Sequence, residues 1–176
     1  MAVVGVDHDD VLNVRNAPGV SGPIVTTLTP LRDDVVATGN NRLLTTSIWY
    51  EIEANGLTGW ASSRFLAYLG ATDDVLGDVV AEIGAPPVAD DFAGLVTLVA
   101  DTFGSPEGEL DISTVFAPFG ENPIVTTIDV LGFQDDSVLG VRLAILGSEV
   151  AEGGYVLQAV DRTFICRRGT SGDLCV

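Results

Sequence analysis

The first 70 residues consist of short apolar runs separated by turn residues, at intervals of about 8 to 12 residues. The runs lie within VLNVRNAPG, PIVTTLTP, RDDVVATGNN and IWYEIEANGLTGW. Residues from Trp49 to Ala54 alternate between a polar-edged face and an apolar one, which is the period of a half-buried strand. Asn55 and Gly56 then supply the positive φ angles of a tight hairpin. This pattern predicts a small all-β barrel or sandwich.

The pattern changes after Gly70, where helical spacing replaces short strands. Apolar residues from Val75 to Ile83 predict one amphipathic helix, ended by Gly84 and Pro86-Pro87, and those from Phe92 to Phe103 predict a second, closed by Gly104. Four β-like runs follow, separated by turns, and predict an antiparallel meander: Ile112–Phe116, Pro123–Phe133, Val138–Leu146 and Gly154–Ile165. We therefore expect two domains, an all-β barrel over residues 1–70 and a small α+β domain over residues 71–176, with the helices covering one sheet face.

Three ordered motifs in the first part carry a family resemblance. They are LNVRNAPG from Leu12 to Gly19, WYEI from Trp49 to Ile52 and GWASSRFL from Gly59 to Leu66. Together they resemble the bacterial SH3 (SH3b) family over residues 3–69. The resemblance implies an SH3-like β-barrel, found mostly in exported bacterial proteins, that recognises cell-wall peptides or other envelope ligands. The long connection expected from Thr38 to Ser47 departs from the family pattern, and residues 71–176 resemble no family that we can name.

Within these motifs, a few polar and aromatic residues are candidates for ligand binding. Val14, Ile52 and Leu66 are expected core residues, and Gly59 permits a close approach of strands. Aromatic rings with a polar handle beside an arginine and an asparagine suit a shallow peptide or glycan site. The candidates are Trp49, Tyr50, Trp60, Arg15 and Asn16. The alternative is that Tyr50 and Trp60 belong to the core and that Arg15 pairs with a nearby acid.

The charge of the chain excludes several classes of partner. Its 25 acidic residues against 8 basic ones, all arginine, give a formal net charge of −17. Nucleic acid and anionic membrane surfaces are improbable partners, because binding to phosphates requires clustered basic residues. The excess of acid is expected to serve solubility.

The two cysteines indicate an oxidising compartment. Cys166 and Cys175 flank a polar segment with two glycines, which can close the short distance that a disulfide needs. Such a bridge would stabilise the fold by roughly 2.7 kcal/mol, although two free thiols in a reducing cytosol are the alternative. We expect an exported protein. No signal peptide is visible in MAVVGVDHDD and no apolar run is long enough to span a membrane, so export implies that a leader preceded the residues given.

The residue inventory argues against catalysis. The chain has no lysine, and its single histidine, His8, is more simply interpreted as solvated than as a base or metal ligand. Residues 71–176 lack a histidine to pair with a cysteine or to bind zinc. No calcium-loop motif accompanies the acidic pairs, and Asp73-Asp74 and Asp90-Asp91 are expected to cap helices. We expect neither a metal nor a cofactor.

One basic cluster remains in the second part, and it leaves two interpretations open. Arg162, Arg167 and Arg168 are expected to form salt bridges, or alternatively to bind an anionic ligand. For the whole chain we expect a non-enzymatic envelope protein that binds a cell-wall peptide or glycan or an envelope protein. Protein–protein assembly is one alternative, and a carboxylate-dependent hydrolase, with two carboxylates in one cleft, is another.

Overall fold

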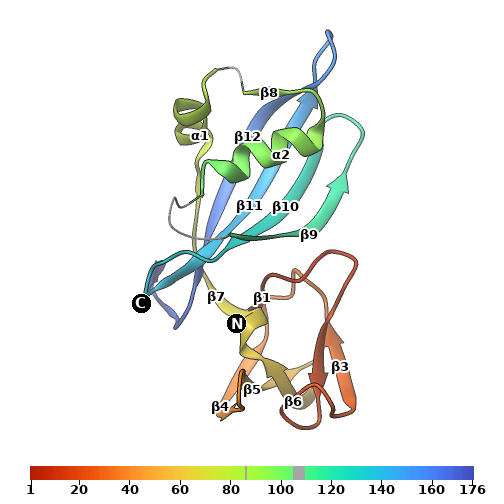
Figure 1. The fold of residues 1–176 in the computed structure, drawn as a ribbon, viewed down its shortest axis with the longest axis vertical. Helices are drawn as coiled ribbons and strands as arrows, with labels where there is room; N and C mark the ends of the chain where they lie inside the picture. Colours follow the sequence, from red (N-terminus) through yellow and green to blue (C-terminus); the bar gives the residue numbers. More distant parts are fainter. Residues whose placement is uncertain (86, 105–109) are drawn as a thin grey trace.

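The computed structural model describes residues 1–85, 87–104 and 110–176. These residues are mostly β, with 52 % of them in strands, and they include two helices. A five-stranded sheet built from the first third of the chain lies at one end of the molecule, and a seven-stranded sheet carrying both helices lies at the other (Figure 1).

The five-stranded sheet is antiparallel and has the order β3-β2-β6-β5-β4. Its core contains Val14, Ile52 and Leu66, which are 1 %, 0 % and 4 % exposed, as the sequence predicted. Asn55 and Gly56 have φ angles of 54° and 72° and form the predicted hairpin. Its strands are β2 (Leu12–Arg15), β3 (Ile24–Leu28), β4 (Val36–Leu43), β5 (Ile48–Ala54) and β6 (Leu57–Ser62).

Most of the expected connection from Thr38 to Ser47 is strand β4, so that prediction was wrong. β4 pairs with β5 through a register shift between Ala37 and Asn41. Every residue of β4 is exposed, so the segment lacks the apolar alternation by which strands are recognised in a sequence.

Strand β7 (Leu66–Asp74) crosses the expected boundary between the domains. It follows a short 3₁₀ turn (Ser63–Phe65), pairs with β1 (Ala2–Val3) at Leu66 and Ala67, and pairs with β12 from Tyr68 onward. A small cluster of buried residues, Val4, Ala67, Leu131 and Ile165, packs where the two sheets approach each other. The division at residue 70 thus falls within one continuous strand, and the existence of two domains stays a prediction.

The larger sheet has the order β1-β7-β12-β11-β10-β9, and a short strand, β8 (Val88–Ala89), also pairs with β12. Its last four strands are antiparallel neighbours in chain order. They are β9 (Asp111–Phe119), β10 (Ile124–Leu131), β11 (Val138–Glu149) and β12 (Tyr155–Cys166).

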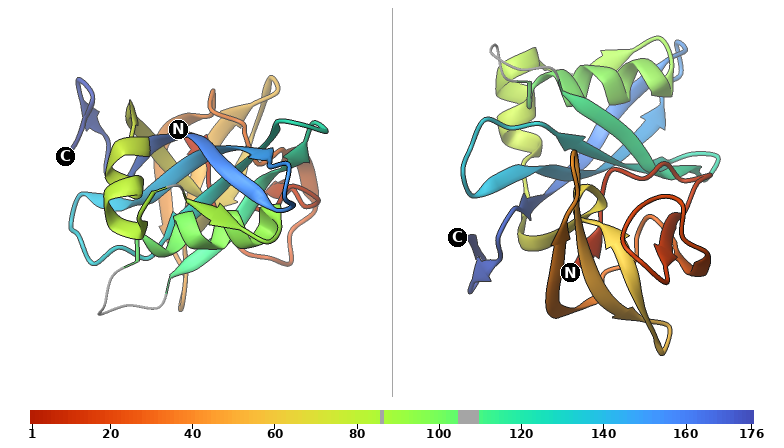
Figure 2. Two further views of the ribbon diagram at one scale, coloured as in Figure 1. Left: turned by 90° about the horizontal axis from the view of Figure 1, so that it is seen from above. Right: turned by 60° about the horizontal axis from the view of Figure 1, so that its bottom comes forward.

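Both predicted helices are present and lie on the same side of this sheet (Figures 1 and 2). They are α1 (Leu76–Ile83) and α2 (Phe92–Asp101). Their buried residues, including Val79, Leu95 and Val99, pack against sheet residues such as Ile128 and Leu143. Burying each large apolar side chain contributes about 1.5 to 3 kcal/mol, so this cluster stabilises the second part of the chain.

The predicted caps hold for α2 and only in part for α1. The Asp91 carboxylate accepts a hydrogen bond of 2.7 Å from the Gly94 amide, as an N-cap does. Asp74 accepts a bond from the Leu76 amide at 2.9 Å, although the residue that caps α1 is Val75. Asp73 instead belongs to β7 and binds Arg162, so its assignment to a helix start was wrong. Of the two prolines expected to end α1, Pro86 lies outside the described residues.

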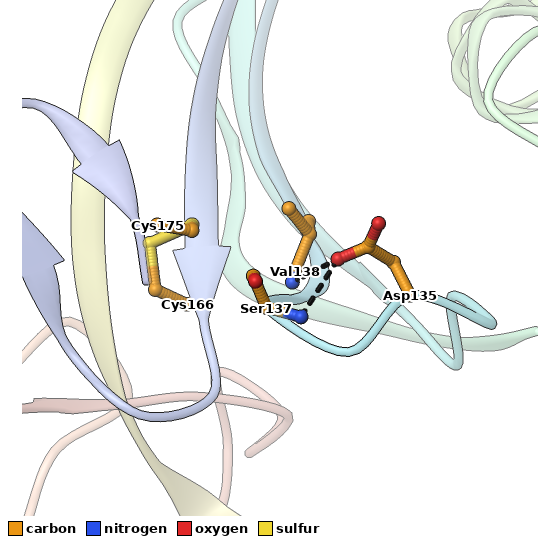
Figure 3. Close-up of a disulfide and its surroundings, with 5 residues drawn as sticks. All are labelled: Asp135, Ser137, Val138, Cys166 and Cys175. Carbon is orange, nitrogen blue, oxygen red and sulfur yellow. Dashed lines mark hydrogen bonds between the residues drawn. A yellow bond between two sulfur atoms is a disulfide. The ribbon is translucent and has the colours of Figure 1, made fainter.

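The predicted disulfide joins Cys166 and Cys175, whose Cα atoms are 5.1 Å apart. It ties a C-terminal hairpin, β13 (Thr170–Ser171) and β14 (Leu174–Cys175), to the end of β12 (Figure 3). The Ala71 amide donates to the Asp173 carbonyl at 2.9 Å, which fixes the hairpin to β7 as well. Seen from above, the hairpin projects at one side of the molecule (Figure 2). None of the helices described here is long and apolar enough to cross a membrane.

Candidate functional site

A cavity of about 480 Å³ lies on the outer face of the five-stranded sheet. We call it the barrel groove, and its polar and aromatic lining includes Asp7, Asp10, Asn13, Arg15, Trp49 and Ser62. The strand register explains this grouping. Trp49 is paired with Ser62 and Arg15 with Trp60, so these residues share one face while Val14 and Ile52 point to the core.

Trp49 is more deeply buried than its expected role as an exposed ligand contact requires. It is 5 % exposed, and its indole Nε1 donates a hydrogen bond of 3.0 Å to the Ser47 hydroxyl. The ring therefore forms the floor of the barrel groove and supports it from below. The only hydrogen-bond donor of the indole is thus bonded within the protein and is not free for a ligand.

Arg15 lies in the barrel groove without a carboxylate partner among the described residues. Its Nη1 donates a hydrogen bond of 2.6 Å to the Gly22 carbonyl, which fixes the side chain across the turn that follows β2. Within residues 1–85, 87–104 and 110–176, the alternative expectation that Arg15 pairs with a nearby acid was wrong. Because a guanidinium has five N–H donors, Arg15 keeps donors for a ligand.

The other three predicted residues lie outside the barrel groove. Asn16 is exposed in the turn, and its main-chain N–H donates to the Pro23 carbonyl at 3.0 Å. Trp60 is half-buried on the outer face, between Arg15 and Glu51 in the register. Tyr50 points to the opposite face and packs against the core. The structure thus brings together two of the five candidates, Trp49 and Arg15.

The acidic side of the barrel groove comes from the N-terminal segment. The Asp7 carboxylate accepts a hydrogen bond of 3.1 Å from the Thr114 amide, and the His8 amide donates to the Thr114 carbonyl at 2.7 Å. Asp10 accepts a bond from the Val11 amide at 2.7 Å. These contacts hold residues 7–10 between the barrel and β9. The side chain of His8 is exposed, at the rim of an apolar cavity of about 500 Å³ between α2 and strands β9 and β10.

A second polar cavity of about 310 Å³, here called the arginine cavity, lies on the other side of the barrel. Its lining includes Asn40, Asn41, Tyr50, Tyr68, Arg167 and Arg168. Tyr50 and the asparagines come from β5 and β4, Tyr68 from β7, and the arginines from the segment after β12. The predicted candidate Tyr50 therefore belongs to this cavity.

The family comparison concerns the barrel. Residues 10–67 match the family model of the bacterial SH3 domain. The match confirms the predicted resemblance for this segment, which we call the SH3 domain. The searches of curated proteins and of solved structures found no significant match.

The matched segment contains only part of each cavity. Asp10, Asn13, Arg15, Trp49 and Ser62 of the barrel groove belong to the SH3 domain, whereas Asp7 precedes it. In the arginine cavity, Tyr68, Arg167 and Arg168 come from outside the SH3 domain. Both cavities are thus completed by residues that the domain itself does not contain.

Hydrogen bonds set the protonation of two carboxylates beside the SH3 domain cavities. The amides of Val138 and Ser137 donate to Asp135 and hold the pKa of its carboxyl below its ordinary value (Figure 3). The Asn40 amide and the Thr38 hydroxyl do the same to the pKa of Glu51. Both groups therefore stay ionised to a lower pH than an ordinary carboxyl group does.

The basic cluster of the second part divides between two roles. Arg162 forms the expected salt bridge, with its Nη2 at 2.5 Å from Asp73 Oδ2. Arg167 and Arg168 instead donate to main-chain carbonyls of the loop from Phe133 to Asp136. Across residues 1–85, 87–104 and 110–176, no cluster of three or more His, Cys, Asp or Glu is placed to hold a metal ion.

Sequence reasoning missed Asp7, Asp10 and Tyr68 as lining residues of the two cavities beside the SH3 domain. The stretch VDHDD offered acidic side chains but no sign that they fold back toward residues 13–62. Only the pairing of this segment with Thr114, more than 100 positions away, places them. The role of Tyr68 could not be predicted for the same reason, because the other side of its cavity is formed by Arg167 and Arg168, about 100 positions further along the chain.

Proposed function

We propose that the protein is a non-enzymatic binding protein of the cell envelope whose barrel groove binds a peptide. The observation that carries this proposal is the arrangement of charge in the groove, where the Arg15 guanidinium and the carboxylates of Asp7 and Asp10 line one hollow above Trp49. A ligand with both an amino group and a carboxylate complements this arrangement. Cell-wall peptides have both groups, and bacterial SH3 domains are commonly cell-wall binding modules.

Export is supported by the disulfide between Cys166 and Cys175. Disulfides persist in oxidising compartments and are rare in the cytosol. The net charge of −17 and the absence of lysine are compatible with an extracellular or cell-wall environment. A bacterial SH3 domain and a disulfide together fit that location.

A binding role without catalysis accounts for the acidic residues of the groove. Asp7 and Asp10 each accept a main-chain hydrogen bond and so have a structural function. A hydrolase would require one carboxyl group as the general acid and a second as nucleophile or base. We therefore prefer binding, and expect incubation with purified cell wall to release no soluble fragments.

The test is co-sedimentation of the full chain with purified peptidoglycan, comparing the wild type with Arg15→Gln and Asp10→Asn. Each variant removes one charge of the groove, and we expect roughly tenfold or greater loss of affinity. Arg64→Gln is the matched control, because Arg64 is exposed and pairs with Asp111 outside the groove. Equal sedimentation of wild type, Arg15→Gln and Asp10→Asn would reject the groove as the peptide site.

The second candidate function is assembly through β9. This strand lies at the edge of the larger sheet, and its apolar residues Ile112 and Phe119 are 48 % and 69 % exposed. Exposed apolar edge strands are a common route to pairing between chains. A mass that rises with concentration in light scattering, and that Phe119→Ser returns to the monomer, would favour assembly, whereas a monomer at all concentrations would remove this candidate.

A further inference from the structure

We propose that the arginine cavity is a second binding site, independent of the barrel groove, which takes the oxyanion of a small ligand: a carboxylate or a phosphate. Arg167 and Arg168 supply the charge, and Tyr50, Tyr68 and Asn41 form the neutral wall. Its volume of about 310 Å³ is at the lower end of the range for small-molecule sites. It is therefore suited to a sugar acid or a phosphate group.

The positive charge of the two arginines is not cancelled by an ion pair within the part of the chain that the structure describes. Arg167 donates through Nε to the Asp135 carbonyl at 3.0 Å and through Nη2 to the Phe133 carbonyl at 2.8 Å. Arg168 donates through Nη2 to the Asp136 carbonyl at 3.0 Å. Since neutral carbonyls take these bonds, each guanidinium keeps its full charge and has N–H donors left over. By contrast, Arg142 and Arg162 are bonded to carboxylates.

The same contacts fix the arginines in position before any ligand arrives. Cys166, bonded to Cys175, directly precedes them, and the Arg167 amide donates to the Ser137 carbonyl at 2.8 Å. The loop that receives their side chains is itself held by Asp135, whose carboxylate accepts the amides of Ser137 and Val138 (Figure 3). A guanidinium held in this way loses little side-chain entropy on binding, which favours affinity.

The composition of the wall is unusual for so acidic a protein. None of the described residues that line the arginine cavity is acidic, although the chain has 25 acidic residues. Asp135 and Asp136 line a separate cavity, which also includes Arg167 and Arg168. Glu51 is not a lining residue, and its carboxylate accepts hydrogen bonds from Asn40 and Thr38. The charged side chains on the wall of the arginine cavity are therefore both positive, which favours an anion.

The experiment is an NMR titration of the full, oxidised chain at constant ionic strength, using two anionic probes and one neutral probe. The anionic probes are inorganic phosphate and N-acetylmuramic acid, which has a carboxylate, and the neutral probe is N-acetylglucosamine. We expect at least one anionic probe to shift the amide signals of Tyr68, Arg167 and Arg168, and the neutral sugar to leave them unchanged. The probe that binds identifies the oxyanion as a phosphate or a carboxylate. No shift with either anion would overturn the proposal.

Variants separate this site from the barrel groove. We expect Arg168→Gln to weaken binding of the anion about tenfold or more, because hydrogen bonds to charged groups are the strong ones, and Arg168→Lys to retain part of the affinity. Arg64→Gln changes the net charge equally and should have no effect. Arg15→Gln should weaken peptide binding about tenfold or more while leaving the anion bound, so the two proposals can fail separately. Equal anion affinity in wild type and Arg168→Gln would contradict the inference even if the protein binds peptidoglycan.

Discussion

Arg142 and Asp129 form a buried, bidentate ion pair where the N-terminal segment meets the larger sheet. Nε and Nη2 of Arg142 donate to the two carboxylate oxygens of Asp129 at 2.7 and 2.9 Å. Their side chains are 10 % and 0 % exposed. Arg142 also donates to the Val3 carbonyl, and the Gly5 amide donates to Asp129, at 2.8 and 2.9 Å. One ion pair thus joins β10 and β11 to the segment that precedes the barrel.

Removal of either member of this pair should strongly destabilise the protein. Asp129→Asn leaves the guanidinium of Arg142 buried without its counter-charge, and the expected loss is about 3 to 5 kcal/mol in the free energy of unfolding. Arg142→Met should cost a similar amount. The measurement is urea denaturation followed by circular dichroism. The exposed pair of Arg64 and Asp111 provides the control, since Arg64→Gln should cost no more than about 1 kcal/mol. Comparable losses from buried and exposed pairs would contradict this account.

Trp49→Ala should lower stability as well as any binding. The ring is 5 % exposed, and truncation of a buried aromatic to alanine costs about 3 to 5 kcal/mol. Trp49→Phe keeps a ring in the floor and loses the bond from Nε1 to Ser47, so its cost should be smaller. Thermal unfolding of both variants checks this. If Trp49→Ala unfolds at the same temperature as the wild type, the indole does not stabilise the fold by packing, and Trp49→Ala then tests ligand contact alone.

The elements were predictable where local pattern decides them. Positive φ at Asn55 and Gly56, and the cap from Asp91 to Gly94, depend on residues at most three positions apart. Strand β4 was missed because all of its side chains are exposed and no alternation marks it. The domain boundary was predicted at residue 70, within β7, because the second half of this strand contains Asp73 and Asp74, which are equally suited to a helix start.

The candidate site was less predictable, since it depends on which strand faces meet. The sequence places Trp49 and Tyr50 side by side, but the pleat sends them to different cavities. The buried pair of Asp129 and Arg142 gives no local signal either, because each residue stands in an apolar run and only the register of β10 and β11 aligns them. Long-range pairing therefore decides where the charges of this protein lie.

Two glycines should respond to alanine in opposite directions. A Cβ at Gly59 would lie 2.8 Å from the Arg15 carbonyl oxygen and 2.7 Å from Val14 Cγ1, so Gly59→Ala must force β6 away from β2. We expect a loss of about 1 to 3 kcal/mol. At Gly77 in α1, a Cβ would have no atom within 4 Å apart from its chain neighbours and the backbone of its own helix, and Gly77→Ala should gain about 0.5 to 1 kcal/mol through helix propensity. Denaturant midpoints compare the two, and a stabilising Gly59→Ala would refute the close approach.

Asp135 should make the turn after β10 sensitive to acid. The amides of Val138 and Ser137 lower its pKa in the folded protein. A lowered pKa contributes stability that is fully present above the ordinary value of about 3.9 and is lost as the pH falls through the lowered value. Carbon-13 NMR of the carboxyl groups should therefore show Asp135 titrating below an ordinary aspartate. Asp135→Asn does not titrate, so its stability difference from the wild type should shrink as the pH falls, and a constant difference would exclude the linkage.

Reduction of the disulfide should destabilise the native protein and weaken the arginine cavity together. Opening a loop with a sequence separation of 9 between Cys166 and Cys175 removes about 2.7 kcal/mol by chain entropy. Arg167 and Arg168 directly follow Cys166, so the reduced protein should also bind the anionic probe more weakly while peptide binding in the barrel groove is retained. Denaturation and NMR titration of oxidised and reduced protein measure both effects. Mass spectrometry of the natively produced protein is the necessary companion, because two free thiols there would remove the argument for export.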